Sequence, residues 1–189
     1  MLSPKSTATF KAVLAALEGL LYLYSEEYKY EVGVLRKYLL RFNYSQGHAV
    51  WYRRLQQVVR LTRRVEEIPI LKMLNIVREH ASIKSTYPPG DLKSNIPSRF
   101  VLVSFQFHIA RLIMVLNALT EATKLLFEDN YRGLARLHMT PQFFTGLANT
   151  AKLVGLCTQW IKDLAKAYKT IAEALPLYMF RWCAGPYPD

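Results

Sequence analysis

The sequence predicts an all-α fold, an elongated bundle of long helical hairpins. Apolar residues recur at the three- and four-residue spacing of amphipathic helices along most of the chain. Only 8 of the 189 residues are glycine, and 51% are hydrophobic, which is enough for a core without a disulfide or a structural metal. Pro69 and the pair Thr140 and Pro141 are typical of helix starts, because proline suits the first helical turn and threonine can cap it. We therefore expect helix in more than about 60% of the residues.

The N-terminal half, residues 1–81, is predicted to be the basic half of a single helical domain spanning 1–189. Its apolar residues keep helical spacing except at a polar junction, 43–48, where Gly47 marks a break. Four helices are expected in this half, at about 7–25, 30–42, 49–67 and 69–81.

A connecting loop is predicted at 82–99, because proline and glycine cluster there and apolar residues are few. The apolar C-terminal half, 100–189, opens with an alternation at 101–109 that is typical of a strand. We predict helix there instead, since helical spacing continues to Leu126 and a lone strand would have no partner. The remaining expected elements are a short helix or turn at 131–138 and a last helix from 140 to about 174, stopped by Pro176.

The apolar segment from Phe100 to Leu119 has the length of a membrane span. It contains Arg111 and His108, and a charge at the centre of a bilayer costs roughly 3 kcal/mol or more, so we predict a buried helix and no membrane. No secretory signal is expected, because charge interrupts the apolar stretch near the N-terminus. Cys157 and Cys183 lie outside any CxxC motif, which favours a reducing compartment.

Positive charge is concentrated in one segment of the chain. The 25 Lys and Arg residues exceed the 14 Asp and Glu residues by 11, and the sequence pI is about 9.7. Between Val32 and Val65 no acidic residue occurs. Such a local excess of positive charge favours an acidic partner. The basic residues of this segment are Arg36, Lys37, Arg41, Arg53, Arg54, Arg60, Arg63 and Arg64.

The predicted third helix, 49–67, separates its apolar and basic residues onto two faces. At 100° per residue, one arc of about 80° is apolar, and an opposite arc of about 60° is basic and polar. The first face is therefore expected to pack and the second to form a basic stripe. The apolar arc holds Trp51, Leu55, Val58, Thr62 and Val65, and the basic arc holds Arg53, Gln57, Arg60 and Arg64.

No pattern in the sequence indicates catalysis. Metal-protease, nucleophile-elbow, dinucleotide-binding and phosphate-loop motifs are all missing from the printed sequence, and the four histidines are scattered. Glu121, Glu128 and Asp129 could share a face, but a solvated helix end explains them, because nothing near them suggests a metal or a raised pKa. We predict no catalytic residue, no cofactor and no metal.

The basic segment mixes arginine with side chains that stack or form hydrogen bonds, a mixture used in RNA recognition. Guanidinium groups bind phosphates, aromatic rings stack on unpaired bases, and amides read base edges. Docking of an acidic protein through the same stripe and a merely solvated basic face are the alternatives. The predicted RNA contacts are Arg36, Lys37, Arg41, Asn43, Gln46, His48, Tyr52, Arg53, Arg54, Arg60, Arg63 and Arg64, whereas Tyr38 and Trp51 are expected in the core.

Four short segments of the chain form a pattern in their order and spacing. The first is NYSQGHAVWY at 43–52, followed by two arginines and a leucine. The others are IPS at 96–98, before a long apolar helix, YRGL at 131–134 and PQFF at 141–144. In this layout the chain resembles the RNase MRP-specific protein subunit family, which is related to the nucleolus and neural progenitor (Nepro) proteins. The resemblance implies a non-catalytic, nuclear and nucleolar subunit of a ribonucleoprotein that processes precursor ribosomal RNA. It also implies that Asn43, Gln46, His48, Arg53 and Arg54 contact RNA.

The last two long helices have few polar positions for a monomer of this size. We therefore expect another protein subunit to cover part of 100–175. Phe143, Phe144 and Trp160 are candidates for that contact, although aromatic residues of this kind are more often internal.

Overall fold

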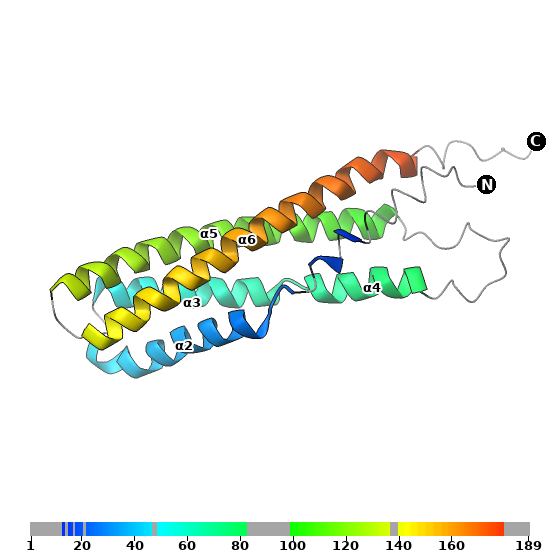
Figure 1. Ribbon diagram of the computed structural model, residues 1–189. Helices are drawn as coiled ribbons and strands as arrows, with labels where there is room; N and C mark the ends of the chain where they lie inside the picture. Colours follow the sequence, from blue (N-terminus) through cyan, green and yellow to red (C-terminus); the bar gives the residue numbers. More distant parts are fainter. Residues whose placement is uncertain are drawn as a thin grey trace, which may run out of the picture. The chain divides into compact units, whose positions relative to one another are not determined.

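The protein is all-helical throughout the part that the structure describes. The computed structural model describes residues 13, 15–16, 18–20, 22–46, 49–82, 99–136 and 140–179. No strand occurs among these residues, and 101–109 is helical, so the all-α prediction, the choice of helix over strand and the predicted helix content are confirmed. The helices are α2 (Glu26–Gln46), α3 (Val50–Glu67), α4 (Ile70–Ser82), α5 (Arg99–Ala135) and α6 (Thr140–Met179) (Figure 1).

Several helix boundaries differ from the sequence-based expectation. Helix α2 begins at Glu26, ahead of Tyr30, because the Ser25 hydroxyl accepts the Tyr28 amide at 3.4 Å and two acidic residues favour the positive end of the helix. The separate short helix or turn expected at 131–138 is absent up to Ala135, because α5 is continuous from Arg99 to Ala135. Helix α6 likewise passes Pro176, which lies only three residues before the helix ends.

The chain divides into two compact units. Unit 2 consists of residues 22–68 and 112–162 and contains α2, α3, most of α5 and the first half of α6. Unit 1 consists of residues 1–21, 69–111 and 163–189 and contains α4, the start of α5 and the end of α6. The unit boundaries fall inside α5 and α6, and the expectation of a single domain remains a prediction.

An aromatic cluster at one end of α2 forms part of the core of unit 2. The Tyr28 and Trp160 rings lie with their centroids 4.7 Å apart, and Tyr24 lies 5.9 Å from Trp160. Tyr28 and Trp160 are each only 1% exposed. Because Tyr28 belongs to α2 and Trp160 to α6, this cluster joins helices that are far apart in the sequence.

Buried polar groups also join α2 to α6. The Asn149 amide donates to the Glu31 carbonyl oxygen at 3.1 Å and to the Glu31 carboxylate. Lys152 lies 3.0 Å from both Glu31 and Glu27, and the hydrogen bond to Glu31 is the main reason that the pKa of the Lys152 ammonium is raised. Since Glu31 is 5% exposed, these contacts compensate the burial of its charge.

Unit 1 has an apolar interior made from its three helices. Its buried residues follow helical spacing on each helix, so each contributes one stripe to the interior. On these helices they are Ile70 and Leu74 of α4, Leu102, Phe105 and Ile109 of α5, and Leu164, Ala167, Ile171 and Ala174 of α6; Val13 and Leu20, from the N-terminal part of unit 1, are buried as well.

Two glycines of α6 provide a matched test of helix packing in unit 2. A Cβ at Gly146 would lie 2.9 Å from the Asn130 amide nitrogen of α5, whereas nothing lies within 4 Å of a Cβ at Gly155. We expect Gly155→Ala to raise the free energy of unfolding by up to about 1 kcal/mol, the helix-propensity gain. Gly146→Ala should lower it by about 1–2 kcal/mol, because the buried Asn130 must move. Urea denaturation measures both, and equal stabilisation by the two substitutions would contradict close α5–α6 packing.

Candidate nucleic-acid interface

Helix α3 has the two faces that its sequence predicts. Its buried side chains are Tyr52, Leu55, Val58, Val59, Thr62 and Val65. Arg53, Arg60 and Arg64 are exposed on the opposite side, within an arc of about 40° of the helix. We call these three residues the arginine face. Gln57 and Arg63 are exposed on the two flanks of this arc.

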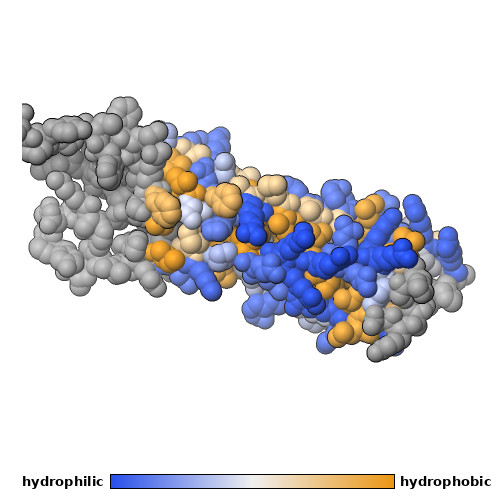
Figure 2. Space-filling model, turned by 180° about the vertical axis from the view of Figure 1, so that it is seen from behind, coloured by the Kyte–Doolittle hydropathy of each residue, from blue (hydrophilic) through white to orange (hydrophobic). Residues whose placement is uncertain are grey.

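Most exposed cations of α2 and α3 have no carboxylate partner among the described residues. Lys29 pairs with Glu26 at 2.7 Å, and none of the other exposed cations on these two helices forms an ion pair in the described ranges. Their internal contacts are weak: Arg60 donates to the Gln56 carbonyl at 3.4 Å, and the Arg41 guanidinium lies 5.8 Å from the centre of the Phe42 ring. Figure 2 shows strongly hydrophilic side chains gathered in a broad band on the side that is distant in Figure 1. The unpaired cations are Lys37, Arg41, Arg53, Arg60, Arg63 and Arg64.

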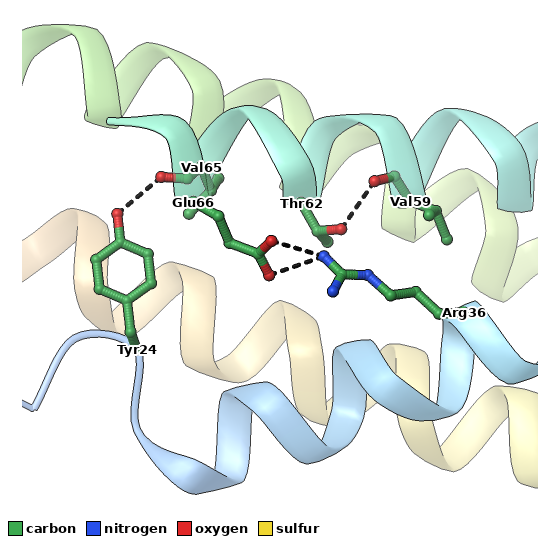
Figure 3. Close-up of polar contacts among 6 residues, drawn as sticks. All are labelled: Tyr24, Arg36, Val59, Thr62, Val65 and Glu66. Atoms are coloured by element: carbon green, nitrogen blue, oxygen red, sulfur yellow. Dashed lines mark hydrogen bonds and ion pairs between the residues drawn. The ribbon is translucent and has the colours of Figure 1, made fainter. Parts of the chain in front are cut away.

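Arg36 forms an ion pair within the protein (Figure 3). Its Nη2 donates to both carboxylate oxygens of Glu66, at 2.8 and 2.7 Å, which ties α2 to α3. Tyr24, which precedes α2, makes a second contact with α3, because its hydroxyl donates to the Val65 carbonyl at 2.7 Å. Burial and the nearby Glu66 raise the pKa of Tyr24 to about 12, so this hydroxyl stays a donor at neutral pH. Arg36 therefore orients α2 on α3, and its charge is largely compensated.

Arg54 is also used internally. Its Nη1 lies 2.9 Å from the Asp129 carboxylate and donates to the Leu125 carbonyl at 2.9 Å, both on α5. The Arg54 and Asp129 side chains are 28% and 11% exposed. Arg36 and Arg54 thus differ from the other predicted contacts, because each connects α3 to a neighbouring helix.

The structure corrects the prediction for Tyr52. This side chain is 1% exposed, and its hydroxyl donates to the Leu39 carbonyl of α2 at 3.0 Å. A buried ring with a satisfied hydroxyl cannot stack on a base, so Tyr52 is a packing residue. Trp51, which was expected in the core, is half-buried instead.

The predicted junction contacts lie largely outside the described residues. Asn43 and Gln46 belong to α2, but the described residues do not include their side chains, and they do not include His48 at all. Their predicted part in RNA recognition stays a prediction.

A cavity of about 450 Å³ opens in unit 2, beside the start of α3. It brings Arg54 and Asp129 together with Arg132 of α5 and Arg136, which directly follows the end of α5; the sequence analysis selected neither of these two basic residues. The expected separate short helix or turn at 131–138 concealed that α5 continues to Ala135 and carries Arg132 to the start of α3. The other lining residues are Ala49, Val50, Trp51, Gly133 and Phe143.

Comparison with known proteins finds no match for this chain. No family model, curated protein or solved structure matches the chain. What the protein does is therefore inferred from its own residues.

The described residues offer little for catalysis. They contain no group of three or more His, Cys, Asp or Glu side chains that could hold a metal ion. Cys157 is buried, and that burial raises the pKa of its thiol to about 12, against a smaller opposing effect of a hydrogen bond with Thr120. A thiol that stays protonated at neutral pH is a poor nucleophile.

An apolar stripe runs along the exposed side of α5. Phe100, Val103, Phe107 and Met114 fall within an arc of about 60° and are 81%, 44%, 64% and 72% exposed. By length and composition α5 could cross a membrane, and 28% of its most apolar window is buried, which is less than we expected. A helix that packs along one stripe of a bundle passes the same composition test, so this signal for a membrane is weak.

The three aromatic residues expected at a protein contact differ in exposure. Trp160 and Phe143 are 1% and 8% exposed, so both belong to the interior. Phe144 is 65% exposed and remains a candidate.

Proposed function

We propose that this protein binds RNA as a non-catalytic subunit of a ribonucleoprotein. The observation that carries the proposal is the arginine face of α3, whose three guanidinium groups have no carboxylate partner in the described part of the chain. Arg53 and Arg64 are eleven residues apart, which spans about 16 Å of helix axis, enough to meet several phosphates of one strand or groove.

The rigidity of α3 supports a phosphate contact rather than a merely solvated surface. Val58 and Thr62 on the opposite face are fully buried, and the contacts of Arg36 and Arg54 connect α3 to helices on both flanks. A fixed helix presents its arginines with little further ordering, so less conformational entropy is lost when phosphates bind.

The resemblance to the RNase MRP-specific subunit family supports a particular assembly. We propose that the assembly is RNase MRP, in which RNA performs the cleavage, and that the protein acts in precursor ribosomal RNA processing in the nucleolus. The predicted junction contacts Asn43, Gln46 and His48, next to the start of α3, would add local recognition of the RNA.

A second subunit of the same assembly is proposed to cover the apolar stripe of α5. Large apolar side chains that share one exposed helix face are typical of protein contacts. The two phenylalanines of this stripe, Phe100 and Phe107, are 81% and 64% exposed.

The salt dependence of binding tests the proposal. RNA should co-purify with the protein and be removed by nuclease, and the logarithm of the binding constant should fall linearly with the logarithm of the salt concentration. Arg60→Gln should reduce that slope by roughly one unit and weaken binding similarly for RNAs of different sequence. Lys162→Gln, which removes an exposed charge on α6, is the matched control. Partners that stay bound after nuclease treatment would favour docking of an acidic protein instead.

A further inference from the structure

We propose that the cavity beside the start of α3 binds one unpaired nucleotide of the RNA, with the base inside and the phosphate at the rim. This inference rests on the proposed RNA-binding function and specifies a second contact, separate from the arginine face. The cavity volume of about 450 Å³ lies within the ~300–1,000 Å³ range of small-molecule sites.

The cavity has an aromatic wall suited to a base. Trp51 is half-buried and lines the cavity together with Phe143. Phe42 and Phe143 each form a T-shaped contact with the Trp51 indole, with ring centroids 5.5 and 5.8 Å away and interplanar angles of 76° and 77°. An indole held in this way is pre-organised to stack on a base.

The cavity also has a positive rim suited to a phosphate. Arg132 lies in the last turn of α5 and Arg136 directly follows the helix, and both are exposed. In the described ranges the only ion pair of Arg132 is with Glu128, at 3.9 Å with both side chains exposed, and Arg136 has none. The first turn of α3 adds partial positive charge, because Ala49 at its N-cap has no side-chain acceptor for the free amides.

Asp129, which lines the cavity, has one carboxylate oxygen without a hydrogen-bond partner among the described residues. Asp129 Oδ1 is paired with Arg54, whereas Asp129 Oδ2 is buried and has no donor there. A buried carboxylate oxygen without a donor is unfavourable, so a rotation of the side chain that brings Oδ2 to the cavity, within reach of an N–H group on the edge of a base, is favoured. The aromatic wall would contact the face of the base, the positive rim would bind the phosphate, and Asp129 would accept a hydrogen bond from the edge of the base.

The nucleotide must be unpaired to reach these groups. A base inside a duplex has its faces stacked and its Watson–Crick edge occupied, so neither Trp51 nor Asp129 could contact it. Proteins that read single bases in RNA use bulges and loops, from which a base can turn outward. A bulged nucleotide would enter the cavity, while the RNA duplex next to the bulge would lie on basic residues of the protein outside the cavity.

The test compares two RNA hairpins that differ only by one bulged nucleotide. The 189-residue chain is expected to bind the bulged hairpin at least about tenfold more tightly, as measured by fluorescence anisotropy at constant salt. The double variant with Arg132→Gln and Arg136→Gln should lose this preference and still bind the fully paired hairpin. The control double variant, Lys162→Gln with Lys166→Gln, removes two exposed charges outside the cavity and should keep the preference.

A second measurement tests whether the base contacts the aromatic wall, and it needs no substitution of Trp51 or Phe143. With 5-iodouridine at the bulge, photo-crosslinking followed by mass spectrometry should place the adduct on Trp51 or Phe143. Equal binding of both hairpins by the unmodified chain, or a crosslink elsewhere, would overturn the cavity proposal and leave the arginine face standing. If neither hairpin binds, the proposed function fails as well, and acidic peptides become the ligands to test.

Discussion

Replacing Arg53, Arg60 and Arg64 together by glutamate is expected to abolish RNA binding and leave the fold intact. The three side chains are exposed and make no ion pair in the described ranges, so the folded state loses almost nothing. RNA loses three phosphate contacts and meets three negative charges instead, which should weaken binding by at least about 100-fold at ~0.15 M salt. Fluorescence anisotropy with labelled RNA measures the loss, and circular dichroism checks the fold.

The matched control replaces Lys72, Lys162 and Lys166 by glutamate. These lysines are also exposed and lie on α4 and α6. Their replacement changes the net charge by the same amount as replacement of the three arginines. Because RNA attraction depends partly on total charge, this variant should bind more weakly than the unmodified chain, but by less than about tenfold. Similar losses in the two triple variants would contradict a localised interface on α3.

Replacing Trp160 by alanine is expected to cause the largest loss of stability. The indole is 1% exposed and lies between α2 and α6 against Tyr24 and Tyr28. Removal of a buried Trp side chain costs about 3–5 kcal/mol of unfolding free energy, because transfer energy is lost and a cavity remains. Urea denaturation followed by circular dichroism measures this change.

Trp160→Phe is the conservative control. It keeps an aromatic ring beside Tyr28 and removes the Trp160 Nε1–H, a buried donor without a hydrogen-bond partner among the described residues. Its cost should therefore be clearly smaller than that of Trp160→Ala. If Trp160→Ala unfolded at the urea concentration of the unmodified chain, the aromatic cluster would not be part of the core.

The packing of α3 could be predicted from its sequence because the periodicity of one helix decides which residues share a face. Leu55, Val58 and Val65 are buried as expected, and Arg53 and Arg60 are exposed. The same reasoning failed at two neighbouring residues. Tyr52 lies about 60° outside the expected apolar arc and is buried, whereas Trp51 lies within that arc, at the start of the helix, and is only half-buried.

The pairing of charges could not be predicted from the sequence, because the partners are distant along the chain. Arg36 pairs with Glu66, which lies outside the acid-free segment, and Arg54 pairs with Asp129, which the sequence indicated only as part of a solvated helix end. These contacts depend on which helices become neighbours. Composition counts the charges of a segment but does not show which of them remain available to a ligand.

By itself, the sequence determined the all-α class, most helix positions and the basic face of α3, since spacing and capping are local properties of the chain. Only the tertiary structure decided which cations are unpaired, and that Arg132 and Arg136 meet Trp51 at one cavity. The physical reason is that a cavity or an ion pair forms where side chains from different helices converge. That convergence depends on contacts between residues far apart in the sequence, such as Asn149 with Glu31.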